Sequence, residues 1–387
     1  MKIQKASIMI SSDLCPINRV DILCNSNNYK EIYNDYIQEL NDVDYRVVNL
    51  ELPITDNLDP IEKRGPVHSV GSKHIEHIKY AGFDLLTLAN NHIRDHGDIG
   101  LKNTIDHIKS NGLNYVGAGE NIDKAKKKFY SNINGIRVAF VNFTENEFSI
   151  ADENRFGANP LNIIDNYNSI KEAKSKSDCV IVIIHGGHEG YRLPSKRMVS
   201  TYNFFVDSGA DIVVSHHSHC FSGYEIYKEK PIFYGLGNFI FDKPKKNNQP
   251  WNYGFSVKLN IVKKDTINCS FELIPYKQCN GDLIGIHKLS QDEEVIFCKE
   301  IEELNSIISS SHLLEDHWSK FVKQRTREYL NHIEPFDNIL VKALRRFRIM
   351  PRLLSSKKRQ LILNLVRCEA HRDILIESLK ENIYKKK

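Results

Sequence analysis

The stretch that most constrains this chain is residues 210–222, A-D-I-V-V-S-H-H-S-H-C-F-S, where a short apolar run meets three histidines. Ile212, Val213 and Val214 form a β-branched run typical of a buried strand in a parallel sheet. Ligands of open α/β sheets bind beyond the carboxyl ends of the strands, and a His-x-His there can direct two imidazoles at one point. Taken alone, the cluster could also be a polar loop with surface histidines. The metal-site interpretation therefore depends on how the other strands end.

Four other apolar runs also end in residue types that bind metals. The five sets of residues at these strand ends are Asp13, Glu51, Asn91 with His92, His185, and His217 with His219. Each set has an ordinary alternative, such as a helix cap for Asp13 or a plain turn for Asn91. Because the carboxyl ends of parallel strands form the ligand-binding edge, we expect all five sets to meet at one edge of one sheet.

Together these residues make a chemically coherent ligand set. Mixed carboxylate, amide and imidazole donors suit Mn, Fe or Zn better than Mg or Ca. A carboxylate can hold two divalent cations about 3.5–4 Å apart, and a water between them loses its proton near neutral pH. An imidazole just outside the ligands can protonate the leaving oxygen. These residues therefore predict a site for divalent metal ions of the Mn, Fe or Zn type, in which one carboxylate can bridge two ions.

The rest of the pattern predicts an α/β domain over residues 1–285 and a helical, basic extension over 286–387. A hairpin is expected at Asn134-Gly135, which is a strong two-residue turn signal. Helical spacing appears between the strands and again from about Leu289 onward. The helices expected between the strands are 27–40, 74–81, 99–110, 163–177 and 195–208.

Composition limits the classes of function. A formal net charge of +4 is too small to indicate a nucleic-acid binder. The eight cysteines include no C-x-x-C pair, which indicates buried free thiols in a reducing compartment. The apolar stretch near the N-terminus is too short for a signal peptide, and the sequence predicts no membrane-spanning segment. We therefore expect a cytoplasmic protein.

The strand-end residues lie in longer motifs whose order and spacing are highly specific. These motifs are N-L-E at 49–51, A-G-F-D-L-L-T-L-A-N-N-H at 81–92, D-H-G-D-I-G-L at 95–101, V-G-A-G at 116–119, H-G-G-H-E-G-Y at 185–191, G-A-D-I-V-V-S-H-H-S-H at 209–219 and Y-G-L-G-N-F-I-F-D at 234–242. With them the chain resembles the CapA (poly-gamma-glutamate capsule synthesis) family, a branch of the calcineurin-like metallophosphoesterase superfamily. The resemblance covers roughly residues 5 to 275.

This resemblance implies a four-layer α-β-β-α sandwich of metallophosphoesterase type with a two-metal site between the sheets. It also implies that Glu51 bridges the two ions. The other implied ligands are Asn91, His185 and His217 for one metal, and Asp13 and His219 for the other. His92 would be the proton donor that contacts the substrate, and Asp95 is placed to orient it.

Two positions depart from the family's pattern. The usual Gly-Asp is Ser12-Asp13 here, with Cys15 where a histidine often stands. Cys15 could be a thiolate ligand, although a buried structural thiol is the favoured interpretation. The usual His-Trp-Gly is His185-Gly186-Gly187, which is expected to leave a hole where a ring would pack. Both changes bear on how well the metals bind.

Three residues that follow the apolar run 179–184 are candidates for binding substrate. His188 and Glu189 lie just past His185 and are expected to line the pocket, while His216 is expected outside the ligand set. Arg192 could meet an anionic substrate, with a solvated surface position as the alternative.

The C-terminal residues carry a concentration of positive charge. From Val341 to Lys387 there are 14 Lys and Arg against 4 Asp and Glu, so the remainder of the chain is mildly acidic. Clusters at 345–348 and 357–359 lie among apolar residues, including Leu354, Leu361, Ile362, Leu363 and Leu365. This pattern fits a segment that docks at the inner face of the membrane, either on the anionic membrane surface or on a membrane complex. A helical subdomain packed on the core fits it equally well.

Two functions follow from these features. The first is a metal-dependent hydrolase of phosphoester type that acts on a small-molecule or polymer substrate in capsule or surface-polymer biosynthesis. The second is a non-catalytic, metal-binding scaffold of a capsule or poly-gamma-glutamate synthesis system. Amide-bond chemistry on a gamma-linked peptide is a third possibility, since the same metal ions could promote it.

Overall fold

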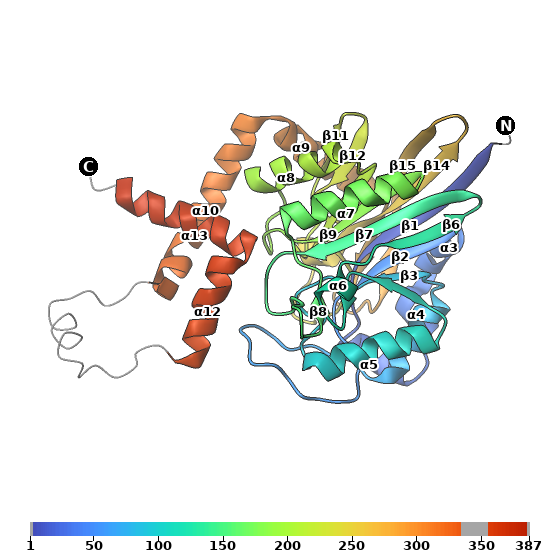
Figure 1. Cartoon of the computed structure of the whole chain (residues 1–387), viewed down its shortest axis with the longest axis horizontal. Helices are drawn as coiled ribbons and strands as arrows, with labels where there is room; N and C mark the ends of the chain where they lie inside the picture. The colour runs from blue at the N-terminus through green and yellow to red at the C-terminus, as the bar shows by residue number, and fades with distance from the viewer. Residues whose placement is uncertain (1–2, 334–354, 385–387) are drawn as a thin grey trace.

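Two β-sheets packed face to face form the centre of the computed structural model, which describes residues 3–333 and 355–384 (Figure 1). The larger sheet has eight strands. Its order is β16 (Ile286–Lys288), β15 (Ile267–Gln278), β14 (Tyr253–Lys263), β1 (Gln4–Cys15), β2 (Tyr45–Leu50), β3 (Leu85–Thr87) and β4 (Asn114–Val116), with β13 (Asn238–Phe241) beside the end of β1. Strands β1 to β4 run parallel, whereas β14 pairs with β1 in the antiparallel sense.

The second sheet has six strands and carries the histidine motifs. Its order is β11 (Tyr224–Tyr227), β12 (Lys230–Phe233), β10 (Ile212–His216), β9 (Cys179–His185), β7 (Ile136–Thr144) and β6 (Phe129–Ile133). Strands β7, β9, β10 and β12 are parallel to one another. A small sheet of β5 (Ala118–Gly119) and β8 (Gly157–Ala158) lies beside them.

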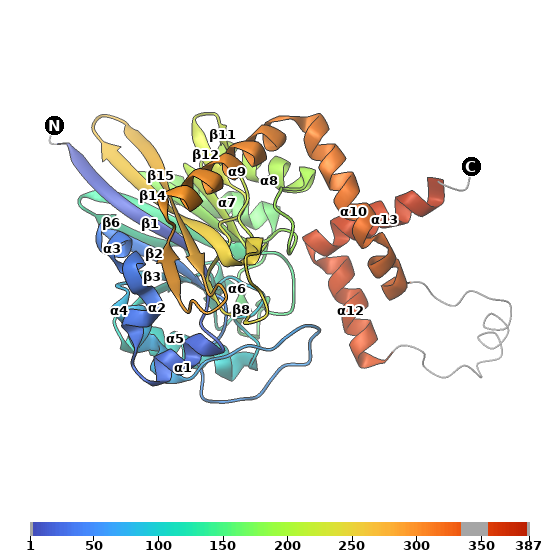
Figure 2. The same cartoon turned by 180° about the vertical axis from the view of Figure 1, so that it is seen from behind.

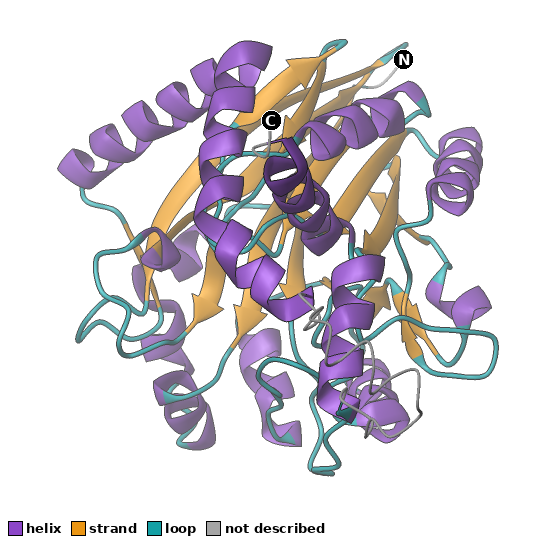
Figure 3. Cartoon of the chain, turned by 90° about the vertical axis from the view of Figure 1, so that its left-hand side faces the viewer, coloured by secondary structure: helices purple, strands orange, loops and turns teal. Residues whose placement is uncertain are grey.

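Helices cover the outer face of each sheet (Figures 2 and 3). The eight-stranded sheet is covered by α1 (Arg19–Asn25), α2 (Tyr29–Tyr33), η1 (Asn34–Tyr36), α3 (Ile37–Asn41), η2 (Ser72–His74), α4 (Ile75–Tyr80) and α5 (Gly97–Ser110). The six-stranded sheet is covered by α7 (Ile163–Lys176) and α8 (Lys196–Asp207), and the short helices α6 (Ile122–Ala125) and η3 (Pro250–Asn252) lie in loops. The four-layer α-β-β-α sandwich is therefore confirmed.

Alternation along the strands produces these layers. In β1, Ile8 and Ile10 belong to the core shared with the six-stranded sheet, whereas Met9 belongs to the core beneath the helices. In β2, Val47 likewise belongs to the core shared with the six-stranded sheet, and Val48 belongs to the core beneath the helices. Successive side chains of a strand point to opposite faces, so a strand buried on both faces is apolar throughout.

The predicted elements mostly match the observed ones, with two corrections. The Asn134-Gly135 hairpin is present, with φ of 50° and 90° at the two turn residues. The single helix expected over 27–40 is instead three short pieces, α2, η1 and α3. The expectation that all five strand ends share one sheet is wrong: β1, β2 and β3 belong to one sheet, and β9 and β10 to the other. An apolar run reveals a buried strand, but it does not reveal which strand pairs with it.

The C-terminal helices pack on the sandwich. They are α9 (Gln291–Ser309), α10 (Ser311–Ile333), α12 (Ser356–Arg367) and α13 (Glu369–Tyr384). Strand β16 still pairs with β15 just beyond residue 285, so the helical part begins at Gln291. Asp373 bonds Arg197 at 2.7 Å, and the Tyr191 and Phe321 rings stack with centroids 4.2 Å apart. The described helices therefore follow the packed-subdomain alternative.

The apolar residues singled out in this extension have different environments. Leu361 and Leu365 are buried, whereas Leu363 is exposed. Leu354 and the basic cluster at 345–348 lie outside the described residues. Docking of this region on a membrane surface stays a prediction.

Replacing Gly117 with alanine should destabilise the fold by about 3 kcal/mol, because two costs combine. Gly117 has a φ of 95°, which alanine adopts only with strain, and an added Cβ would lie 1.9 Å from Asn142 Oδ1. That oxygen accepts the Ala89 N–H at 2.8 Å, while Asn142 Nδ2 donates to the Ile183 carbonyl, so the side chain links both sheets. Urea denaturation measures the loss.

The matched control is Gly112→Ala. Gly112 has a φ of 72° but nothing within 4 Å of an added Cβ, so only the backbone strain of about 1 kcal/mol is expected there. Equal losses in the two variants would show that the Asn142 link contributes little.

Candidate metal centre

The carboxyl ends of the parallel strands of both sheets lie at the same place, and the predicted ligands lie there. Asp13 is near the end of β1, Glu51 directly follows β2, and His185 ends β9. His217 and His219 follow β10. All five side chains are buried. The site therefore lies between the two sheets, as the family resemblance implied.

One group of candidate ligands consists of Glu51, His185 and His217, whose ligand atoms lie within 4.8 Å of one another. His185 Nε2 is 3.4 Å from Glu51 Oε1 and 3.0 Å from His217 Nδ1. Asn91 Oδ1 lies 3.1 Å from the same His185 nitrogen. The four side chains that the resemblance assigns to one ion therefore lie together, and their role as ligands stays a prediction.

A second group shares Glu51 with the first. It consists of Asp13, Glu51 and His219, again within 4.8 Å. His219 Nδ1 is 3.9 Å from Asp13 Oδ2, and His219 Nε2 is 3.9 Å from Glu51 Oε1. Glu51 is therefore placed to contribute to both groups, which is the geometry that a bridging carboxylate needs.

His216, which was expected outside the ligand set, lies close to the predicted ligands. Its ring is buried, and Asp13, His185 and His216 form a further group within 4.8 Å. Both ring nitrogens of His216 lack a hydrogen-bond partner. In the motif H-H-S-H the first two histidines are adjacent, and sequence spacing alone did not indicate which of them would approach Asp13. The structure places both close to the centre.

The loop after β10 has an unusual backbone. His217 and His219 have φ of 90° and 56°, in the left-handed region that non-glycine residues rarely adopt. The His217 N–H donates to Asp13 Oδ2 at 3.1 Å and fixes the turn. Such strain persists only where surrounding contacts impose it, and it is common at functional sites.

The buried polar atoms fit a pair of divalent cations. Both carboxylate oxygens of Glu51 are buried without a hydrogen-bond partner, which is costly unless a cation compensates for their charge. Burial would lower the pKa of His185, but Glu51 and Asp13 outweigh it and raise the pKa to about 10. The two buried carboxylates therefore strongly favour a positive charge beside them. Carboxylate, amide and imidazole donors together suit Mn, Fe or Zn.

A second histidine system lies next to these ligands. His92 Nδ1 is 2.7 Å from Asp95 Oδ2, and the same carboxylate accepts the His68 N–H at 2.8 Å. Lys63 forms an ion pair with Asp95 and lies 3.2 Å from His92 Nδ1. The His68 and His92 rings have centroids 4.7 Å apart. Asp95 therefore holds the His92 ring through Nδ1, and the catalytic roles of the pair stay predictions.

The family comparison agrees with this geometry. The model of the bacterial capsule synthesis protein PGA_cap matches residues 7–243, which include all six predicted metal ligands. The chain belongs to the PGA_cap family. Relatives include the capsule biosynthesis protein CapA of Bacillus anthracis, 34% identical over 251 residues (62% of this chain, 61% of the relative). The PGA biosynthesis protein CapA of Bacillus subtilis is 35% identical over 204 residues (52% of this chain, 54% of the relative).

The match to these PGA_cap relatives is partial, since the chain spans less than two thirds of either Bacillus protein. Among solved structures, a phosphatase of Mycoplasma pneumoniae aligns at 13% identity and a TM-score of 0.43, covering 71% of this chain and 94% of that one. A 5'-nucleotidase of Candida albicans aligns at 13% identity and a TM-score of 0.38, covering 82% and 57%. Within residues 3–333 and 355–384, no helix is both long and apolar enough to cross a membrane.

The departures from the PGA_cap pattern have structural explanations. No hole is left at Gly186, because an added Cβ would lie 2.8 Å from Glu145 Cγ, so the expectation of an unfilled space is wrong. Glu145 is held there by Arg197 at 2.7 Å. Ser12 donates its hydroxyl to the Gly237 carbonyl. Cys15 is buried and does not join the ligand groups found among the described residues.

A cavity of about 220 Å³ lies beside the ligands and is lined by residues from distant parts of the chain. Asn91, His92 and Glu189 line one side, and the loop 63–66 lines another. The C-terminal helices also contribute to its lining, with Tyr329, Leu361, Asn364, Leu365 and His371. Those helices lie beyond the region that the PGA_cap model matches. A larger cavity of about 560 Å³, near α5 and β4, contains none of the predicted site residues.

The three candidate substrate residues have different positions. Glu189 is exposed and lines the cavity, and the nearby His219, His217 and His92 lower the pKa of its carboxyl to about 2. His188 instead packs against Trp318, with ring centroids 4.8 Å apart. Arg192 bonds Glu300 at 2.8 Å and lies over the Phe221 ring. The cavity lining includes Glu189 but neither of the other two, and all three roles stay predictions.

Sequence reasoning missed several residues of the site. Glu147 Oε1 lies 3.7 Å from His217 Nε2, and Glu147 also lines the cavity. It follows the apolar strand β7, so the strand-end signal used for the other ligands could have found it. Tyr329 and His371, which are hydrogen-bonded at 2.7 Å, carry no such signal because they lie within helices.

Proposed function

We propose that this protein is a metal-dependent hydrolase that acts on a phosphoester bond during synthesis of a capsule or related surface polymer. The observation that supports this proposal most is the pair of ligand groups sharing Glu51, with the His92–Asp95 pair at the adjoining cavity. Membership of the PGA_cap family supports the biosynthetic context.

The proposed roles follow from the positions of the side chains. Glu51, Asn91, His185 and His217 would hold one ion, and Glu51, Asp13 and His219 the other, with His216 close to Asp13. When bound, such ions supply a Lewis acid and lower the pKa of water. Asn49 donates to Asp13 Oδ1 at 2.8 Å and holds this carboxylate in place.

His92 is proposed to give a proton to the leaving oxygen. Asp95 accepts the Nδ1–H, so the proton would be given from the Nε2–H of the imidazolium form, which leaves the neutral ring still bonded to Asp95. Arg64, in the cavity lining, places positive charge where an anionic substrate group would enter, whereas the charge of Lys63 is paired with Asp95. The C-terminal helices line part of the cavity and would contact a bound substrate there.

The alternative is a non-catalytic role in the same synthesis. The relatives' names favour it in one respect, since a Mycobacterium tuberculosis relative that is 26% identical over 212 residues is called a probable polyglutamine synthesis accessory protein. A scaffold would need the ligand groups for binding or stability, but it would not need a proton donor oriented by a buried carboxylate.

Removing metal should abolish hydrolysis. After treatment with a chelator and its removal, the protein should show at most about 1% of its activity on phosphomonoester and phosphodiester test substrates, because a bound ion is worth several kcal/mol. Adding Mn²⁺, Fe²⁺ or Zn²⁺ should restore the activity. A protein that binds metal but hydrolyses none of these substrates under any metal would favour the scaffold function.

A further inference from the structure

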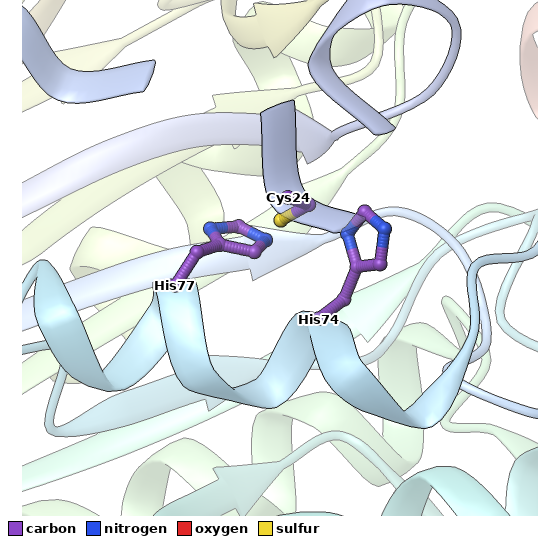
Figure 4. A group of neighbouring side chains, drawn as sticks. All are labelled: Cys24, His74 and His77. Atoms are coloured by element: carbon purple, nitrogen blue, oxygen red, sulfur yellow. The ribbon is translucent and has the colours of Figure 1, made fainter. Parts of the chain in front are cut away.

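A second set of metal-ligand side chains lies beneath the outer helices. Cys24 is on α1, His74 on η2 and His77 on α4, and one ligand atom from each lies within 4.8 Å of the other two. All three side chains are fully buried. Figure 4 shows the two imidazole rings and the Cys24 sulfur gathered around a common point. None of these residues belongs to the site between the sheets.

Each imidazole is held by an outer partner through one nitrogen. His74 Nε2 is 2.8 Å from Asp21 Oδ1, and His77 Nδ1 is 2.8 Å from the Tyr33 hydroxyl. The opposite nitrogens, His74 Nδ1 and His77 Nε2, are buried without a hydrogen-bond partner. Metal-binding histidines typically donate their second N–H to a carboxylate or similar group, which fixes the ring and exposes the other nitrogen.

His74 Nδ1 and His77 Nε2 are therefore the ring atoms that remain free to bind a ligand. Two unpaired buried nitrogens side by side are unusual unless something binds them.

We infer that Cys24, His74 and His77 bind a single divalent cation of zinc type, separate from the hydrolytic centre. One thiolate and two imidazoles form a soft ligand set that suits tetrahedral zinc, with water in the fourth position. Binding would release the Cys24 thiol proton to solvent and leave a thiolate on the metal. Asp21 and the Tyr33 oxygen would accept the N–H groups on the far side of the two rings.

The location indicates a structural role. An ion there would connect α1, which follows β1, to η2 and α4, which precede β3. At the start of α1, Arg19 bonds Asp242 at 2.6 Å, close to β13. The ion would thus fasten the helical layer over the strands that carry Asp13 and Glu51.

The test is cobalt substitution in the full-length protein. Cobalt-loaded wild type should show a sulfur-to-cobalt charge-transfer band, and Cys24→Ser should lose that band together with one bound ion. Cys15→Ser removes the thiol near the hydrolytic centre and should keep the band. Cys279→Ser, a buried thiol in the same helical core, is the matched control and should also keep it.

Two results would overturn the inference. The first is a band lost in Cys15→Ser but retained in Cys24→Ser, which would assign the thiolate to the hydrolytic centre. The second is zinc-loaded wild type whose X-ray absorption spectrum shows only nitrogen and oxygen ligands, a measurement that needs no variant to fold. The expected spectrum contains a sulfur contribution that disappears in Cys24→Ser.

Discussion

Replacing Glu51 with alanine should remove most of the metal from the centre between the sheets and lower hydrolysis at least about a thousandfold, equivalent to about 4 kcal/mol. Glu51 is the residue that the two predicted ligand groups share, so its loss weakens both at once. The neighbouring Asp13, His185 and His219 would remain, but without the carboxylate between them. Metal analysis of the purified variant, together with its rate on a phosphodiester, measures both effects.

The control is Glu153→Ala, which removes an exposed carboxylate from a loop. It should retain metal content and activity. If Glu51→Ala keeps both metals and its rate, Glu51 does not bridge them, and the assignment of both groups fails.

Replacing His92 with alanine should lower kcat about 10²- to 10⁴-fold while the metal content stays unchanged, because positioned general acids contribute rate factors of that size. His92 belongs to none of the metal-ligand groups found among the described residues, and its Nδ1 is held by Asp95 at 2.7 Å. Single-turnover rates separate this chemical step from product release.

The His92 variant separates the two proposed functions. His312→Ala, which removes an exposed histidine on α10, is the control and should behave as wild type. An unchanged rate in His92→Ala would show that some other group supplies the proton. Absence of hydrolysis by the metal-loaded wild type would leave the scaffold function as the better account.

The ends of the strands can be predicted from the sequence. In a folded domain, an apolar run that stops at a carboxylate or imidazole has few interpretations other than a buried strand that ends there. Asp13, Glu51 and His185 were found in this way, and the structure brings them together. Pairing between strands depends on contacts distant in sequence, so the division of β1 and β9 between two sheets could not be obtained from local pattern.

The walls of the cavity were the least predictable part. Glu145 fills the space beside Gly186, and it does so because Arg197 on α8 holds it there. Tyr329 and Leu365 face the cavity from C-terminal helices whose apolar residues could equally have met a membrane. Amphipathic spacing identifies a buried face, but it does not identify what buries it.

Anomalous scattering from crystals grown with Mn²⁺ tests the central claim most directly. The account predicts two peaks between the sheets, one near Glu51, His185 and His217, and the other near Asp13, Glu51 and His219. Both peaks should contact the Glu51 carboxylate. Manganese-soaked crystals with no peak among these residues, or with ions that do not touch Glu51, would contradict it.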